Sequence, residues 1–274
     1  MKGRHAVAWV VRLVIAVGLA VLMLVPFGVM ISTSLMEEFE VFRLPPPMLP
    51  ASPRWANYEE ALTALPFGRF FANTIVFALL VAAGQVITAA MAGYAFARYH
   101  FPGRRQLFAL VLGLLMVPGI VLLIPRFLLL NALGWVDTIH GLVSAELVSV
   151  WGIFLLRQAY QAVPRELEDA ARLDGAGAWG VFRHVALPAV RPALATLALF
   201  AFIDAWKSYL WPLIATRSLE RRTVEVGVAA FHGFYVSNWP YQMAAATAAA
   251  LPLLLVFLLA QRYFIRGIQL TGFR

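Results

Sequence analysis

Long runs of hydrophobic residues alternate with polar segments along this chain of 274 residues. The runs cover approximately residues 13–31, 71–95, 107–124, 141–156, 193–214 and 243–264. Most have roughly the 20 residues that an α-helix needs to cross a bilayer, and the fourth run is short but extendable at both ends. Pro118 and Gly119 interrupt the third run, where a kink is expected. The pattern predicts an all-α integral membrane protein whose six transmembrane helices form a single domain over residues 1–274.

Residues 35–70 form the polar segment after the first run. They contain Glu37, Glu38 and Glu40, followed by consecutive prolines at positions 45–47. Acidic residues and prolines at this density indicate a loop in water rather than a membrane helix. We therefore expect residues 35–70 to be an extracytoplasmic loop.

Residues 164–192 are also polar, but they carry the signals of folded structure. Pro164 suits the first turn of a helix, where its missing N–H group has no intrahelical partner to lose. The acidic residues that follow interact favourably with the helix dipole, and Gly175 is a natural end for this helix. A second short helix is expected over residues 178–187, closed by Pro188. The segment predicts a helix, a glycine turn and a helix, although a solvated loop with some helical content explains the same composition.

The composition agrees with a membrane protein. Hydrophobic residues make up 62% of the chain, charged residues make up 13%, and the mean hydropathy is +0.78. A soluble domain has about 25% charged residues. The net charge of +8 is explained by arginine in cytoplasmic loops, so it does not indicate a nucleic-acid partner. The chain has no cysteine, and its first hydrophobic run is longer than that of a typical signal peptide, so we interpret this run as an uncleaved anchor.

The distribution of arginine and lysine predicts the orientation in the membrane. With a cytoplasmic N-terminus, the inner segments carry thirteen of these residues and the outer segments carry seven. Cytoplasmic loops are enriched in both residue types, so the count favours cytoplasmic N- and C-termini and a cytoplasmic segment 164–192. The arginine cluster at residues 217–222 is the one feature against this orientation.

The stretch Asp169–Ala176 reads D-A-A-R-L-D-G-A and is followed by Phe182 and by Leu187–Pro188. This order resembles the EAA loop of ABC-importer permeases, approximately E-A-A-x-x-D-G-A followed by an aromatic residue and L-P. Asp169 replaces the first glutamate, and Gly177 stands where relatives often have Ser or Thr. The resemblance implies a type I ABC-importer permease fold, in which this cytoplasmic helix-turn-helix loop docks into a groove of an ATPase subunit. The residues it implies for ATPase coupling are Glu168, Asp169, Ala170, Ala171, Asp174, Gly175 and Ala176.

Three further stretches resemble the carbohydrate branch of these permeases, and in particular its maltose-type second subunit. They are Asn57–Tyr58, A-G-Y-A-F-A-R at residues 92–98 and Q-R-Y-F-I-R-G at residues 261–267. The resemblance implies a permease subunit of an ATP-driven, binding-protein-dependent importer for a sugar or oligosaccharide, surrounded by lipid in the inner membrane of a prokaryote. The implied protein partners are a second homologous permease, two ATPase subunits and an extracytoplasmic solute-binding protein.

The sequence contains no motif for catalysis or for a bound cofactor. The only lysines are Lys2 and Lys207, and neither lies in the glycine-rich setting of a nucleotide-binding loop. The histidines are scattered without metal-ligand spacing, and no Ser/His/Asp motif is present. We therefore expect a non-enzyme without a cofactor or metal, whose ATP is bound by a separate ATPase subunit.

Asp204 and Lys207 lie three residues apart in the fifth hydrophobic run. Charged side chains are costly in lipid and usually face a cavity or a partner. These two either neutralise each other between helices or form a polar wall of the translocation path, where Trp206 and Tyr209 supply aromatic faces for a sugar. Tryptophan and tyrosine also gather at the membrane interface without any ligand. Two more candidates for the same cavity, or for hydrogen bonds between helices, are Glu146 and Gln85.

Three alternatives compete with this interpretation. A permease for a polyamine or another small polar solute has the same coupling loop. A self-contained secondary transporter or channel agrees with the isolated charges but leaves the loop unexplained, and copurification with an ATPase discriminates between the two. A membrane-embedded enzyme lacks any supporting motif.

Overall fold

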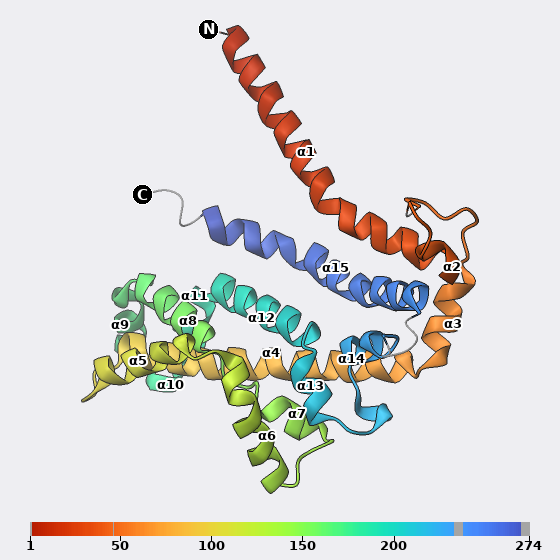
Figure 1. Cartoon of the computed structure of the whole chain (residues 1–274). Helices are drawn as coiled ribbons and strands as arrows, with labels where there is room; N and C mark the ends of the chain where they lie inside the picture. Colours follow the sequence, from red (N-terminus) through yellow and green to blue (C-terminus); the bar gives the residue numbers. More distant parts are fainter. Residues whose placement is uncertain (1, 46, 233–237, 270–274) are drawn as a thin grey trace. The chain divides into compact units, whose positions relative to one another are not determined.

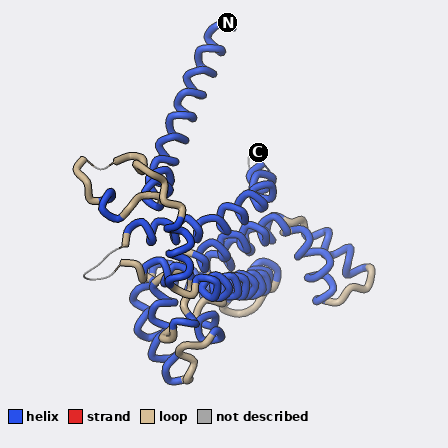
Figure 2. Tube along the Cα trace, turned by 90° about the vertical axis from the view of Figure 1, so that its right-hand side faces the viewer, coloured by secondary structure: helices blue, strands red, loops and turns tan. Residues whose placement is uncertain are grey.

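The structure is a computed structural model that describes residues 2–45, 47–232 and 238–269, with the side chains of residues 9–261 inside those ranges. The described residues form helices and connecting loops and contain no strand (Figure 1, Figure 2), which confirms the predicted all-α fold. The α-helices are α1 (Lys2–Ser34), α2 (Glu38–Val41), α3 (Ala56–Ala64), α4 (Phe67–Arg98), α5 (Arg104–Gly113), α6 (Leu123–Ala132), α7 (Ile139–Ser144), α8 (Val150–Ala162), α9 (Arg165–Leu173), α10 (Ala178–Val181), α11 (Leu187–Ala189), α12 (Arg191–Trp206), α13 (Leu210–Ala215), α14 (Val224–Ala229) and α15 (Trp239–Gln269). Shorter helical turns are η1 (Leu114–Met116), η2 (Gly119–Leu122), η3 (Phe182–Ala186, a π-helix) and η4 (Leu219–Arg221).

Three helices of the described residues are long and apolar enough to cross a membrane by themselves. They lie at Trp9–Ser34 in α1, at Phe67–Arg98 in α4 and at Trp239–Gln261 in α15. Two bent pairs, Arg104–Met116 with Gly119–Ala132 and Ala178–Ala189 with Arg191–Trp206, raise the number of candidate spans to five if each pair is one span. In α1, none of the apolar window is buried within the chain, so this surface is suited to contact with lipid or with a partner.

Three of the six predicted hydrophobic runs are broken rather than continuous helices. The third bends by 96° at the predicted Pro118, since proline removes a backbone hydrogen-bond donor. The fourth is divided between α7 and α8, and the hydroxyl of Ser149 accepts a hydrogen bond from the Gly152 N–H group to start α8. The fifth is divided between α12 and α13 by Lys207–Tyr209. All six runs nevertheless lie in helical segments.

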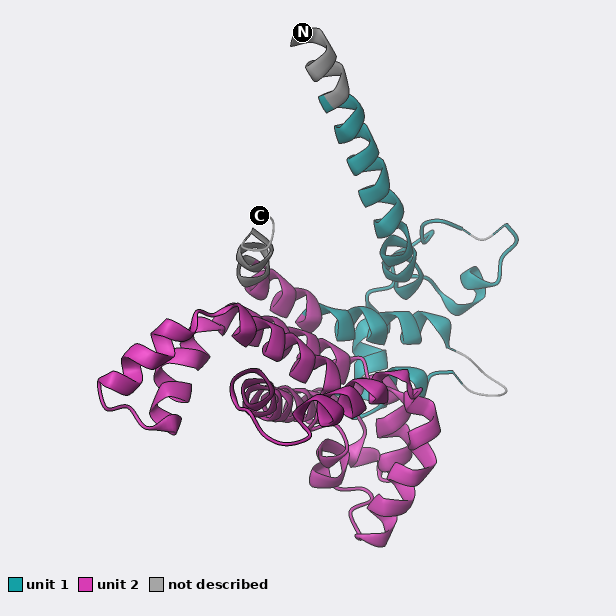
Figure 3. Cartoon of the chain, turned by 90° about the vertical axis from the view of Figure 1, so that its left-hand side faces the viewer, with its two compact units in different colours: residues 1–67, 227–251 teal, residues 68–226, 252–274 magenta. Residues whose placement is uncertain are grey.

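The chain divides into two compact units, which Figure 3 colours separately. Unit 1 consists of residues 1–67 and 227–251, and unit 2 consists of residues 68–226 and 252–274. In unit 1, the fully buried side chain of Asn57 donates hydrogen bonds of 2.9 and 2.8 Å to the carbonyls of Ser34 and Met36 at the end of α1. The hydroxyl groups of Tyr58 and Ser34 lie 2.7 Å apart. The Asn57–Tyr58 dipeptide thus ties α3 to the end of α1.

The core of unit 2 lies where α4 and α8 meet. Alanines on α4, including Ala89, Ala90 and Ala97, are buried against Leu156 and other core residues. Gly93 permits the closest approach, because a Cβ atom there would lie 3.0 Å from both the Leu156 Cβ and the Arg157 backbone nitrogen. Small residues on α4 therefore let it pack closely against the helix that leads into the segment beginning at residue 164.

Candidate functional site

The predicted helix-turn-helix is present in unit 2, and its turn is a glycine. Helix α9 ends at Leu173, and Gly175 has a φ of 86°. The Ala176 N–H group donates a 2.9 Å hydrogen bond to the Ala171 carbonyl, as in a helix end closed by a left-handed residue. The prediction that Gly175 ends the first helix is therefore confirmed. We call residues 165–181 the hairpin.

The second helix of the segment is longer than predicted. It begins after Gly177, whose N-cap position has no side-chain hydrogen bond. It continues through the π-helical turn Phe182–Ala186 and through Pro188 in α11, which ends at Ala189 with Val190 as its C-cap. The expectation that Pro188 closes the helix is therefore wrong, because Pro188 lies inside α11 and directly follows the π-helical turn.

Glu168 is buried, unlike the other residues implied for ATPase coupling. Its side chain is 3% exposed, and its Oε1 atom lies 2.6 Å from Nε of Arg98, which is 6% exposed. The Tyr94 hydroxyl donates a 3.1 Å hydrogen bond to the second carboxylate oxygen. Arg98 also donates a 2.7 Å hydrogen bond to the Val163 carbonyl, just before α9. These contacts fix the hairpin to the end of α4, and the implied role of Glu168 in ATPase coupling stays a prediction.

The opposite side of the hairpin is exposed. Asp169, Ala170, Asp174 and Gly175 are exposed, and Ala171 and Ala176 are partly so. Two large apolar side chains that were not predicted as site residues join them, Leu173 at 90% exposure and Trp179 at 62%. Leu173 could have been recognised as the only large apolar residue directly before the Asp-Gly pair. The coupling face, as we call it, comprises Asp169, Ala170, Leu173, Asp174, Gly175 and Trp179.

An aromatic cavity of about 320 Å³ adjoins the coupling face. Its wall from α4 includes Met91 and Tyr94. The ring of Phe182 lies 5.0 Å from that of Tyr94 and 5.3 Å from that of Trp179. Together with the small residues of the coupling face, this cavity gives the hairpin an apolar surface that a side chain of another protein can enter.

Asp204 and Lys207 do not form the predicted pair. Both side chains are exposed, and no ion pair joins them among the described residues. Lys207 is the C-cap of α12, and its N–H group still donates a 3.0 Å hydrogen bond to the Ile203 carbonyl, so the helical i,i+3 spacing from Asp204 is kept while the two exposed side chains stay apart. The acid that Lys207 influences is instead Glu225 on α14, whose pKa is raised by burial and lowered in part by Lys207.

The remaining translocation candidates fall into separate environments. Trp206 is fully buried, and its ring packs against those of Phe71 and Phe202, so its ring is part of the core of unit 2. Tyr209 is 42% exposed. None of the six candidates lines any of three cavities in the described part of the chain, and their place in the translocation path stays a prediction.

Glu146 and Gln85 connect helices. The Glu146 carboxylate forms an ion pair with Arg126, with 2.8 Å between its Oε1 atom and the Arg126 Nη1 atom. The Gln85 side chain donates a 2.9 Å hydrogen bond to the Glu146 backbone carbonyl. These contacts join α4 and α6 to the segment between α7 and α8. The interpretation of Gln85 as a hydrogen bond between helices agrees with the structure.

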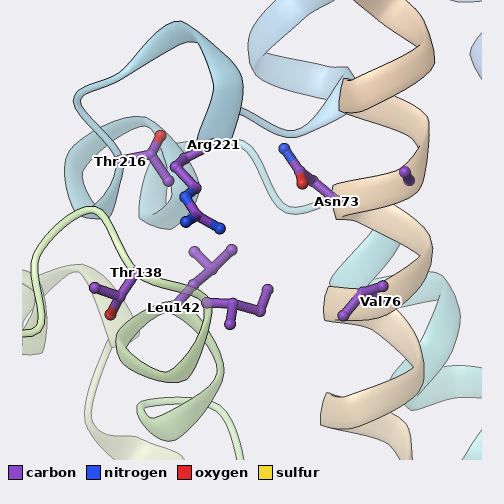
Figure 4. Close-up of a pocket in the computed structure, with 8 residues that line it drawn as sticks. Asn73, Val76, Thr138, Leu142, Thr216 and Arg221 are labelled. Atoms are coloured by element: carbon purple, nitrogen blue, oxygen red, sulfur yellow. The ribbon is translucent and has the colours of Figure 1, made fainter.

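A polar cavity that sequence reasoning missed lies at the start of α4 (Figure 4). Its volume is about 230 Å³, and Asn73 and Val76 face it from α4 while Arg221 and Thr216 face it from the opposite side. The Asn73 amide donates hydrogen bonds of 2.7 and 2.9 Å to the carbonyls of Glu220 and Arg222. The cavity offers hydrogen bonds and one positive charge, which suit binding rather than covalent chemistry. Its residues come from segments about 150 positions apart, so no local signal could have revealed it.

The family model described as "Binding-protein-dependent transport system inner membrane component" matches residues 85–270. The match includes the hairpin, α12 and α13 and therefore covers both groups of predicted site residues.

Curated relatives are similar over most of the chain. The arabinooligosaccharides transport system permease protein AraQ of Halalkalibacterium halodurans is 34% identical over 203 residues, 74% of this chain and 73% of the relative. The sn-glycerol-3-phosphate transport system permease protein UgpE of Rhizobium meliloti is 30% identical over 269 residues, 95% of each chain.

Solved structures share the fold. A chain of a bacterial ABC transporter involved in the import of the acidic polysaccharide alginate superposes with a TM-score of 0.82 over 94% of this chain and 97% of its own, at 23% identity. A chain of the bacterial alginate ABC transporter in complex with an alginate pentasaccharide-bound periplasmic protein has a TM-score of 0.65 over 92% of both chains, at 14% identity.

Proposed function

The chain belongs to the family of binding-protein-dependent transport system inner membrane components, and from this premise we propose that it is a permease subunit of an ATP-driven importer for a sugar or an oligosaccharide. It is a multi-pass membrane permease and not an enzyme. The substrate class is supported by the relative named for arabinooligosaccharides and by the carbohydrate-branch stretches at residues 57–58, 92–98 and 261–267.

A small polar solute is the second candidate substrate. Relatives named for sn-glycerol-3-phosphate are 30–32% identical to this chain over 87–99% of its length, which favours a phosphorylated polyol over the polyamine alternative.

The single observation that carries the proposed mechanism is the two-sided hairpin. Glu168 joins the hairpin to α4 through Arg98 at 2.6 Å, while the coupling face is exposed on its other side. In the proposed mechanism, ATP binding closes two ATPase subunits, and the coupling face follows their movement. The Arg98–Glu168 pair passes this movement to α4, and the permease changes from inward-open to outward-open. No cofactor of the permease is required, because ATP is bound by the ATPase subunits.

The proposed assembly contains a second homologous permease, two ATPase subunits and an extracytoplasmic binding protein that delivers the solute. A permease with one hairpin contacts one ATPase, so two permeases match two ATPases. Both termini and the hairpin lie on the cytoplasmic side in this proposal, which the thirteen-to-seven distribution of positive residues supports.

Uptake in a strain that lacks this chain tests the substrate class. We expect labelled arabinooligosaccharide uptake to be lost on deletion and restored by the wild-type chain, whereas labelled sn-glycerol-3-phosphate uptake stays unchanged. Loss of sn-glycerol-3-phosphate uptake with unchanged arabinooligosaccharide uptake would make the phosphorylated polyol the preferred substrate. The proposal would be refuted if deletion changed the uptake of neither solute and a tagged chain failed to copurify an ATPase and a second permease from native membranes.

Single-cysteine labelling tests the orientation without background, since the natural chain has no cysteine. Asp174→Cys should resist an impermeant thiol reagent added outside intact cells and should react after permeabilisation. Trp55→Cys, at an exposed position in the predicted extracytoplasmic loop, is the control that should react in both conditions. Labelling of Asp174→Cys in intact cells contradicts the cytoplasmic placement of the hairpin.

A further inference from the structure

Three arginines line one cavity between the end of α4, the start of α5 and the middle of α8, all within unit 2. The cavity measures about 270 Å³ and is formed by Arg104, Arg105, Arg157, Phe96 and Phe108. Figure 1 shows α4, α5 and α8 next to one another in the region that holds it. Neither the proposed coupling mechanism nor the candidate translocation residues use this cavity.

Two of the three arginines are held in place by neutral groups. The Arg157 guanidinium lies 4.1 Å from the centroid of the Phe108 ring, and its Nε atom donates a 3.4 Å hydrogen bond to the Phe96 carbonyl. Arg104 donates a 2.9 Å hydrogen bond to the Tyr99 carbonyl. These contacts orient the side chains without neutralising their charge.

No carboxylate balances the three charges. Among the described residues, the ion pairs involve other arginines, and none includes Arg104, Arg105 or Arg157. Glu168 is already paired with Arg98, and residues 98–105 contain no acid. Like charges around a cavity with partly apolar walls repel one another and attract an anion.

The cavity lies where an apolar exposed surface begins. Helix α5 starts at Arg104, and the next turns expose Leu107 at 46%, Leu110 at 66% and Leu115 at 55%. Arginines at this boundary stand at the level of lipid headgroups, while the leucines continue into the hydrocarbon region. Guanidinium groups bind phosphate oxygens with paired N–H donors.

We propose that this cavity binds the phosphodiester headgroup of an anionic phospholipid such as phosphatidylglycerol. The paired arginines bind the phosphate, the phenylalanine rings cover the glycerol, and the acyl chains follow the leucines of α5. Free phosphate would use the same arginines but would gain nothing from the apolar surface beside them. The inference rests on the proposed function only in that the chain spans a membrane, and it is independent of the substrate and of the partner subunits.

Native mass spectrometry and melting of the purified full-length chain test the proposal. Mixed micelles or nanodiscs contain either phosphatidylglycerol or phosphatidylcholine, so the result does not depend on orientation or on transport. We expect retained phosphatidylglycerol and a higher melting temperature in its presence for the wild type. Arg104→Gln with Arg157→Gln should weaken the apparent affinity for phosphatidylglycerol by about tenfold or more.

Matched controls separate this site from a general charge effect. Arg183→Gln with Arg191→Gln removes two exposed positive charges from unit 2 outside the cavity and should leave the affinity unchanged. If the double variant at the cavity does not fold, Arg105→Gln carries the test, because Arg105 is exposed and takes part in no ion pair among the described residues.

Three outcomes would overturn the proposal. The first is equal phosphatidylglycerol affinity in the cavity variants and the control. The second is complete competition by inorganic phosphate at millimolar concentration, which would identify a site for free phosphate. The third is unchanged lipid affinity with loss of a copurified subunit in the cavity variants, which would show that a partner's acidic side chain neutralises the arginines.

Discussion

The charged side chains of the hairpin form ion pairs, whereas Asp204 and Lys207 of the α12–α13 segment do not pair with each other, although both segments belong to unit 2. In α9, which runs unbroken from Arg165 to Leu173, Glu168 meets Arg172 at i,i+4 with a separation of 3.5 Å. In the other segment, Lys207 is the C-cap of α12 and keeps the i,i+3 spacing from Asp204, yet no ion pair joins the two exposed side chains among the described residues. Helical spacing alone therefore does not predict an ion pair, and the acid that is paired is the one that Arg98 and Tyr94 also hold in place.

The same comparison separates two kinds of role. The buried acid of the hairpin is satisfied by Arg98 and Tyr94 of the same chain, so its first role is to position the hairpin. Asp204 and Lys207 are exposed and unpaired with each other, and Lys207 acts on Glu225 of α14 instead. Their role in the translocation path stays a prediction.

The largest expected effect comes from breaking the buried pair. Glu168→Gln leaves the Arg98 charge with 6% side-chain exposure and no ionised partner, and such a loss destabilises a protein by about 3–5 kcal/mol. We expect a matching loss in the free energy of unfolding, measured by denaturation of the chain in bicelles.

The control for this prediction removes both charges. Arg98→Met with Glu168→Met should recover most of the lost free energy, because no unpaired charge is left in the core. Equal destabilisation of the single and double variants would show that the pair is not buried. Copurified ATPase should fall with Glu168→Gln only in proportion to the folded fraction, if Glu168 positions the hairpin rather than contacting the ATPase.

The second effect concerns the exposed side of the same helix. Leu173→Glu and Ala170→Glu place a charge on the coupling face and should reduce the ATPase retained on washed membranes by about tenfold or more, the size of an interface hot spot. Folding should change little, because Leu173 is 90% exposed. Ala170→Ser keeps the side chain small and is the matched control. Full ATPase retention in both glutamate variants would contradict the proposal that this face contacts the ATPase.

The sequence predicted the hairpin well because its signals are local. Pro164 and Gly175 mark the first helix by their own backbone properties, and the hydrophobic runs mark the helical segments among which the three to five candidate membrane spans lie. The Arg98–Glu168 pair could not be predicted in this way, because seventy positions separate its members. The breaks at residues 145–149 and 207–209 lack a proline or glycine, and the local signal at the first, the Ser149 N-cap of α8, lies inside a hydrophobic run that masks it.

A substitution in the turn of the hairpin is expected to have a smaller effect on the free energy of unfolding, and a second glycine nearby provides the control. Gly175 has a φ of 86° and no atom within 4 Å of an added Cβ, so Gly175→Ala should cost about 1 kcal/mol through backbone strain alone. Gly177 has equally open surroundings but a φ of −70° and is the N-cap of α10, so Gly177→Ser, which adds an N-cap hydroxyl, should not lower the free energy of unfolding. Equal costs at both positions would mean that the turn is not held in the left-handed conformation.

The smallest effect on stability is expected in α12–α13, where the two charges do not meet. Because Asp204 and Lys207 are exposed and form no ion pair in the described chain, Asp204→Asn and Lys207→Met should each change the free energy of unfolding by less than about 0.5 kcal/mol. Their effects should add within a similar margin in the double variant. Denaturation in bicelles measures this, and solute uptake by the same variants reports any role in transport. Reduced uptake with unchanged stability would support a place in the translocation path. A coupling energy well above 1 kcal/mol would instead show that the two charges pair within the membrane, and the contrast with the hairpin would be lost.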